Sequence, residues 1–133
     1  MKRPWMSYRG RVAGATKTYT INGIKCDSKL EAYMYDLLVR YNIKFVFQKK
    51  FVLQDTFRYK TGVIRAITWT VDFVFEDLNI VMDTKGFATD VAKIKMKMFK
   101  KIYGDKYDLQ IVKNKKEADN FAIWIKALMM NKK

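Results

Sequence analysis

The chain has 133 residues, half of them apolar and 15% aromatic, which suffices for one hydrophobic core and excludes a disordered basic chain. It carries 27 Lys plus Arg against 13 Asp plus Glu, and the resulting net charge of +14 favours a polyanionic partner such as nucleic acid. His is absent and Cys26 is alone, which excludes His-dependent chemistry, an intrachain disulfide and a zinc knuckle.

The first elements in chain order are an arm, a hairpin and a helix. Residues 1–17 are rich in Lys and Arg with little apolar periodicity, and this arm is either a disordered solubilising tail or a nucleic-acid-binding segment. In residues 18–26, Asn22-Gly23 separates two alternating segments, which predicts a small hairpin. Residues 28–41 repeat apolar side chains with a 3.6-residue period, which predicts a helix.

The remaining elements alternate between strands and helices. Strands rich in β-branched and aromatic residues are predicted at 43–54, 62–75, 79–85 and 107–112, and helices at 90–104 and 117–130. The helix at 90–104 places Val91, Ile94, Met98 and Ile102 on one stripe, with Gly104 as its C-terminal cap. This order predicts an α+β fold with a mixed sheet, in a single domain that spans residues 18–133.

The stretch VDFVFEDLNIVMDTKGF, residues 71–87, predicts a hairpin whose acids meet. The short segment EDLN joins its two strands, and a turn there pairs Phe75 with Ile80, Phe73 with Met82 and therefore Asp72 with Asp83. The same register places the four apolar side chains on one face, and Asp72, Asp83 and Lys85 on the other.

A cation bound between two facing carboxylates would relieve the repulsion between them. Their Cβ atoms would lie about 4.5–5.5 Å apart, a distance at which two negative charges repel each other. Mg²⁺ resolves this conflict, because it commonly binds one or two carboxylates together with phosphate oxygens. Lys85, two residues beyond Asp83, would then reach a water or a phosphate under attack. The alternative is a surface face with two acids and a compensating lysine.

Glu31 is a third candidate acid, with two interpretations. Ser28-Lys29-Leu30-Glu31 fits a capping box in which Ser28 begins the helix and Glu31 bonds back to it. However, Glu31 also lies within about 20° of Leu38 on a helical wheel, at the edge of the buried arc, and could face the active side of the sheet.

The order of the acidic motifs resembles that of the PD-(D/E)XK nuclease superfamily. It consists of an acid on the first helix, then an Asp, then acid-x-Lys on the next strand. The stretches IKCDSKLEAYMYDLL, RAITWTVDFVF and MDTKGFATDVAKIKMKMF are similar to those of small phage proteins related to Holliday-junction resolvases. The resemblance covers roughly residues 18–112. It implies a restriction-endonuclease-like αβββαβ core with an added C-terminal helix, in the host-cell cytoplasm if the protein is phage-encoded.

The resemblance also implies roles for individual residues. Asp72 and Asp83 would be the metal-binding acids, Lys85 the motif lysine, Glu31 a helix-borne acid at the metal site, and the Thr84 main-chain carbonyl a further ligand. The cofactor would be Mg²⁺, with Mn²⁺ able to substitute, and the products would carry 5′-phosphate and 3′-hydroxyl ends. The chain departs from the family pattern where Val71 replaces the motif proline and where Asp83 replaces the commoner glutamate.

Basic side chains around this site suggest how DNA would bind. Phosphate contacts are expected from the arm, the strands and the helix at 90–104, through Arg9, Arg11, Lys49, Arg65, Lys93 and Lys97. We expect recognition of branched DNA such as a four-way junction, which favours a homodimer, with Trp124, Met129 and Met130 or the N-terminal hairpin as possible dimer surfaces.

Other functions remain open beside junction resolution. The rivals are a less structure-selective phage recombination or repair endonuclease, a more remote transposase-subunit-like nuclease, and a non-catalytic basic DNA-binding protein. We expect a protein without a membrane partner, because the apolar runs are far shorter than the roughly 18 residues that cross a bilayer.

Overall fold

The protein was analysed as a computed structural model that describes residues 19–21, 23–85 and 88–132. Its internal contacts divide the chain into two units, Met1–Lys44 with Val112–Lys133, and Phe45–Ile111. The predicted arm, residues 1–17, lies outside the described residues. The order of helices and strands confirms the predicted mixed α+β fold.

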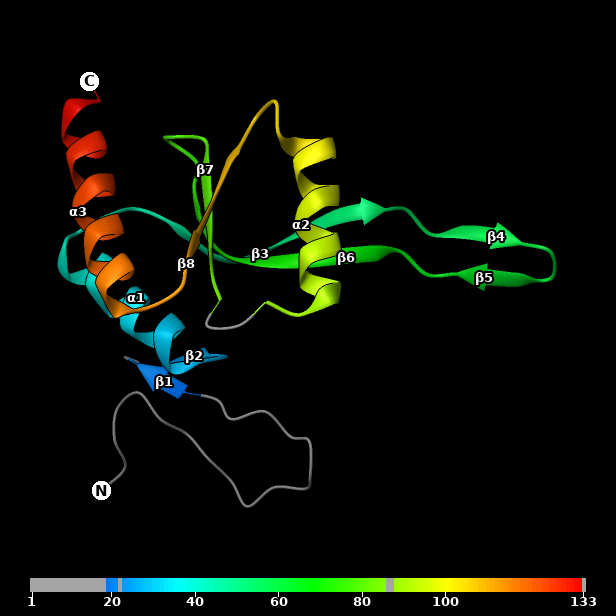
Figure 1. The fold of residues 1–133 in the computed structure, drawn as a ribbon, viewed down its shortest axis with the longest axis horizontal. Coiled ribbons are helices and arrows are strands. Elements are labelled where there is room, and N and C mark those ends of the chain that lie inside the picture. The colour runs from blue at the N-terminus through cyan, green and yellow to red at the C-terminus, as the bar shows by residue number, and fades with distance from the viewer. Residues whose placement is uncertain (1–18, 22, 86–87, 133) are drawn as a thin grey trace, which may run out of the picture. The chain divides into compact units, whose positions relative to one another are not determined.

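The first unit combines a small hairpin with two helices (Figure 1). Strand β1 (Tyr19–Ile21) pairs antiparallel with β2 (Ile24–Cys26), and Gly23 between them has a φ of +81°, as a tight turn requires. Helices α1 (Lys29–Arg40) and α3 (Lys115–Asn131) lie side by side. The Tyr33 hydroxyl joins them by donating to Asp119 Oδ1 at 2.7 Å.

The second unit is built on a four-stranded sheet. Its order is β3 (Val46–Gln54), β6 (Ile67–Phe75), β7 (Ile80–Thr84) and β8 (Asp108–Val112). Both β3 with β6 and β6 with β7 pair antiparallel, whereas β7 and β8 are joined by a helical crossover, which makes the sheet mixed. All five residues of β7 are buried, so this strand is central to the unit.

Helix α2 (Asp90–Tyr103) covers one face of the sheet (Figure 1). Its buried residue Phe99 stacks edge-on against Phe51 and Trp69, and these rings belong to one core cluster, Phe51, Leu53, Trp69, Val71, Val74, Val81, Phe99 and Tyr107. The cluster fixes which side of α2 faces the sheet.

Of the stripe predicted along this helix, only Met98 packs against the core cluster within the described residues. Val91, Ile94 and Ile102 are 61%, 57% and 47% exposed. The large rings of the sheet accept Phe99 and Tyr103 instead, which turns the aliphatic stripe toward solvent. Gly104 caps the helix as predicted, and its N–H donates to the Lys100 carbonyl.

The strand predicted at 62–75 is interrupted. Its first part, β5 (Gly62–Ile64), pairs with β4 (Phe57–Tyr59) in a separate two-stranded ribbon, and β6 begins only at Ile67. The Ala66 N–H donates to Thr56 Oγ1 at 3.1 Å, which ties the two strands together at the foot of the ribbon. The ribbon continues beyond α2 (Figure 1).

Within the described ranges, no helix combines the length and the apolar character needed to span a bilayer.

Candidate active site

The β6–β7 hairpin has the register that the sequence predicted. Phe75 pairs with Ile80 and Phe73 with Met82, and all four side chains are buried. The turn is closed by the Leu78 N–H, which donates to the Phe75 carbonyl at 3.0 Å. The regular pairing ends at Phe73 and Met82, and Asp72 and Asp83 are the residues one step further along the two strands.

At that step, bonds between main chain and side chains connect the two strands. The Asp72 N–H donates to Asp83 Oδ1 at 3.0 Å, and the Thr84 N–H donates to Asp72 Oδ2 at 2.8 Å. The Thr84 hydroxyl donates to the same Asp72 oxygen at 2.6 Å. Each acid thus accepts a main-chain donor of the opposite strand, and this reciprocal contact holds both carboxylates in place.

The alternation of side chains between the two faces of β6 is interrupted at Asp72. Val71 and Val74 belong to the same core cluster against α2, although they are three residues apart and strict alternation would put them on opposite faces. Between them, Phe73 packs instead against the ring of Phe45, with the centroids 5.5 Å apart. On β3, Gln48 lies opposite Asp72 and has a φ of +57°. The irregularity frees Asp72 from the regular alternation of the strand.

Lys85 pairs with the buried Asp83. Its ammonium Nζ lies 2.5 Å from Asp83 Oδ2, and the exposed fractions of the two side chains are 23% and 1%. No directional hydrogen bond from the described residues reaches this Oδ2, so the contact is ionic. Lys85 therefore supplies the positive charge that a buried carboxylate requires.

The oxygen atoms at this level suit a hard divalent cation. Asp72 and Asp83 offer carboxylate oxygens, the ligand type that Mg²⁺ prefers, and two carboxylates are a usual protein contribution. Within the described residues, no three or more Asp, Glu, Cys or His side chains are grouped so that they could hold a metal ion. The Thr84 carbonyl as a further ligand stays a prediction.

Glu31 takes the capping role that the sequence suggested. Its N–H donates to Ser28 Oγ at 3.0 Å, and its Oε1 accepts from the Asp27 N–H at 3.2 Å. The return bond thus reaches Asp27 and not Ser28, the partner of a standard capping box. Glu31 belongs to the first unit, and its role as a metal ligand stays a prediction.

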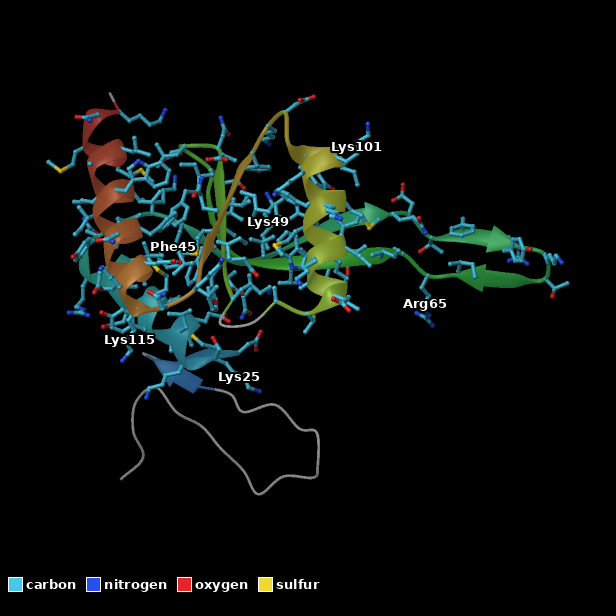
Figure 2. All side chains as sticks on the ribbon, in the orientation of Figure 1. Lys25, Phe45, Lys49, Arg65, Lys101 and Lys115 are labelled. Atoms are coloured by element: carbon cyan, nitrogen blue, oxygen red, sulfur yellow. The ribbon has the colours of Figure 1, made fainter. Side chains whose placement is uncertain are left out.

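The predicted DNA-binding residues have different environments. Arg9 and Arg11 lie outside the described residues, whereas Arg65, Lys93 and Lys97 are exposed. Figure 2 shows the Arg65 side chain extending away from the foot of the ribbon. Phosphate binding by these residues stays a prediction.

Lys49 has a local partner that the sequence did not reveal. Its ammonium donates to Glu76 Oε2 at 2.7 Å, and the Tyr107 hydroxyl donates to Glu76 Oε1 at the same distance. The bond to Glu76 raises the pKa of Lys49, while the bonds from Lys49 and then Tyr107 lower the pKa of Glu76. This network fastens the β6–β7 turn to β3 and to the start of β8.

Sequence reasoning also missed the Thr84 side chain. Alternation along β7 puts Thr84 on the face opposite Asp83 and Lys85, so a hydroxyl contact with Asp72 was not expected. A threonine between the two motif residues was the available signal, because its hydroxyl can reach a carboxylate on the next strand.

Comparison with known proteins gave one family. The family model described as "Protein of unknown function (DUF1064)" matches residues 12–119, which is most of the chain. Searches of curated proteins and of solved structures found no match.

Proposed function

This chain belongs to the DUF1064 family, and we propose that it is a Mg²⁺-dependent DNA endonuclease that hydrolyses phosphodiester bonds. The observation that carries the proposal is the reciprocal bonding of Asp72 and Asp83 beside the Lys85 ammonium. Two fixed carboxylates and one ammonium form a usual set for metal-assisted phosphodiester hydrolysis.

Each residue of the candidate site would have a separate role in the reaction. Asp72 and Asp83 would hold Mg²⁺, which when bound would neutralise charge on the scissile phosphate. Thr84 fixes the carboxylate of Asp72 through its N–H and hydroxyl, so this ligand needs little reorganisation on binding. Lys85 would exchange its contact with Asp83 for the attacking water or a phosphate oxygen, where negative charge develops.

The charge of the chain supports DNA as the substrate. A net charge of +14 attracts a polyanion, and the exposed Arg65, Lys93 and Lys97 belong to the same unit as the acidic pair. The resemblance to phage junction resolvases favours branched DNA, with a four-way junction as the preferred form and a cytoplasmic homodimer as the acting species. Mn²⁺ is expected to replace Mg²⁺.

Cleavage assays on matched substrates test the proposal. A four-way junction, a flap, a linear duplex and a single strand of the same sequence are incubated with the protein and Mg²⁺. We expect paired cuts confined to the junction. Equal cutting of all four substrates would contradict junction selectivity and leave a general endonuclease.

A matched variant separates catalysis from binding. Asp83→Asn keeps the oxygen that accepts from the Asp72 N–H and removes the negative charge. We expect this variant to bind the junction with wild-type affinity and to cut it at least about 100-fold more slowly. Tight junction binding by the wild type without cutting under Mg²⁺ or Mn²⁺ would contradict the enzyme and leave a DNA-binding protein.

A further inference from the structure

The β4–β5 ribbon presents an exposed apolar face that no helix or strand among the described residues covers. Its register pairs Phe57 with Ile64 and Tyr59 with Gly62, so Phe57, Tyr59 and Ile64 share one face. These side chains are 44%, 60% and 42% exposed. A two-stranded ribbon is at best marginally stable alone, and burial of this face would stabilise it.

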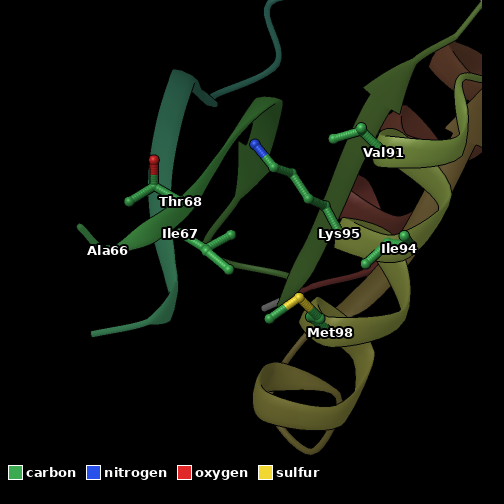
Figure 3. Close-up of a pocket in the computed structure, with 7 residues that line it drawn as sticks. All are labelled: Ala66, Ile67, Thr68, Val91, Ile94, Lys95 and Met98. Atoms are coloured by element: carbon green, nitrogen blue, oxygen red, sulfur yellow. The ribbon is translucent and has the colours of Figure 1, made fainter. Parts of the chain in front are cut away.

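An apolar groove lies on the same unit, between α2 and the start of β6 (Figure 3). Val91, Ile94 and Met98, three of the four residues of the predicted stripe, line it from the helix. The groove has a volume of about 430 Å³, and its other lining residues are Ala66, Ile67, Thr68 and Lys95. Figure 3 shows Lys95 reaching from the helix toward β6.

The ribbon does not reach its own groove. Ile67 lines the groove at the foot of the ribbon, and Gly62, in the last pair before the turn, is five residues away. At about 3.3 Å per residue this pair lies about 16 Å from Ile67 along the strand. The ribbon runs outward beyond α2 (Figure 1), so the two surfaces of one chain cannot cover each other.

We infer that the two surfaces meet between two copies of this chain, with the ribbon of each copy in the groove of the other. A two-fold axis makes the contact isologous, so one arrangement covers both apolar surfaces in both copies and closes the assembly. An aromatic side chain buries about 150–250 Å². Phe57 and Tyr59 are 44% and 60% exposed, so each can lose only part of that area. The exposed parts of Ile64, Val91 and Ile94 add to it toward the about 800 Å² per partner of a standard interface.

Charge and surface chemistry favour a second copy over DNA in this groove. Its described lining is mainly aliphatic, and among these residues only Lys95 offers a cation to a phosphate backbone. One pair of opposite charges accompanies the two surfaces: the Lys60 ammonium, 5.4 Å from the centre of the Tyr59 ring at the ribbon tip, and the exposed Asp90, which precedes Val91 at the groove. Two copies of net charge +14 repel each other, so the dimer strengthens with added salt, whereas phosphate contacts weaken.

Matched substitutions test this interface by sedimentation equilibrium without DNA. Tyr59→Glu is paired with Val63→Glu, an equally exposed position on the opposite face of the ribbon. Ile94→Glu is paired with Ile102→Glu, which lies on the same helix outside the groove. We expect Tyr59→Glu and Ile94→Glu to raise the dimer dissociation constant more than about tenfold, and the two controls to leave it unchanged.

Cross-linking tests the contact directly. A mixture of Tyr59→Cys and Ile94→Cys proteins should form a covalent dimer with a short bismaleimide, while Val63→Cys with Ile94→Cys should not. Native Cys26 is buried, so we expect it to react slowly with the maleimide. Wild-type protein treated in the same way serves as the control for this background reaction. A monomer at all concentrations, equal effects of variants and controls, or dissociation by Trp124→Glu instead would overturn the interface. None of these results bears on the nuclease proposal, because no DNA or metal is present.

Discussion

Thr84 holds the carboxylate of Asp72 with two donors, its N–H at 2.8 Å and its hydroxyl at 2.6 Å, both directed at Oδ2. Asp72 in turn gives its own N–H to Asp83 Oδ1 at 3.0 Å. The two acids are thus oriented by the strands themselves, before any ligand arrives. The proposed metal-dependent nuclease centre would benefit from this preorganisation.

Thr84→Val removes the hydroxyl and keeps the volume and the N–H. We expect Mn²⁺ affinity and the cleavage rate to fall by about 10–100-fold, because Asp72 loses the hydroxyl donor that helps to orient it. Calorimetric Mn²⁺ titration and single-turnover cleavage measure the two effects. Thr84→Ser should restore both, and equal losses in Thr84→Ser and Thr84→Val would contradict the role of the hydroxyl.

The Lys85–Asp83 pair predicts unequal effects of removing either partner. Lys85→Met leaves Asp83, 1% exposed, as a buried carboxylate without its cation, and should lower the free energy of unfolding by about 3 kcal/mol. Asp83→Asn should lower it by only about 1 kcal/mol, since Lys85 is 23% exposed and can turn to water. Urea unfolding in EDTA measures both values.

Mg²⁺ should rescue the stability of Lys85→Met. A divalent cation beside Asp83 replaces the missing ammonium charge, so added Mg²⁺ should stabilise this variant more than the wild type. Thermal unfolding with and without Mg²⁺ gives the comparison. Identical shifts in both proteins would show that the ion does not bind at Asp83.

The Lys49–Glu76 pair predicts a pH-dependent contribution to stability. The bond from Lys49 lowers the pKa of Glu76 in the folded state, so the contribution is present above the ordinary carboxyl pKa and is lost as pH falls through the lowered value. The pKa of Lys49 is raised, so its contribution is present below the ordinary lysine pKa and is lost as pH rises through the raised value.

Glu76→Gln measures this contribution. Both side chains are more than one third exposed, so screening by solvent limits the loss at pH 7 to about 0.5 kcal/mol. In urea unfolding series, the difference between wild type and Glu76→Gln should disappear once the pH has fallen through the lowered pKa of Glu76. A constant difference at all pH values would show that packing, and not charge, is responsible.

Much of the fold follows from local patterns in the sequence. The turn EDLN and the alternating apolar residues determine the β6–β7 register, and the 3.6-residue period determines α1. The orientation of α2 could not be predicted, because its aliphatic stripe and its aromatic stripe both have helical spacing. Only the rings of Phe51 and Trp69 on the sheet decide that Phe99 is buried.

The sequence predicted which residues form the candidate site, but not the hydrogen bonds between them. The hairpin register alone placed Asp72 beside Asp83, and spacing placed Lys85 next to Asp83. The contact of Thr84 with Asp72 depends on the exchange of faces at Gln48 and Asp72, which strict alternation cannot show. The ribbon was missed because β4 and β5 have three residues each, too few for a clear pattern.

The most direct test of the central claim is single-turnover cleavage of a four-way junction in Mg²⁺ by the wild type and by Asp83→Asn. The protein concentration should saturate binding, so that the rate reports on chemistry alone. We predict cleavage by the wild type that EDTA abolishes, and a rate at least about 100-fold lower for Asp83→Asn at equal junction affinity. Equal rates for the two proteins would contradict the assignment of the Asp72–Asp83 pair as the catalytic metal site.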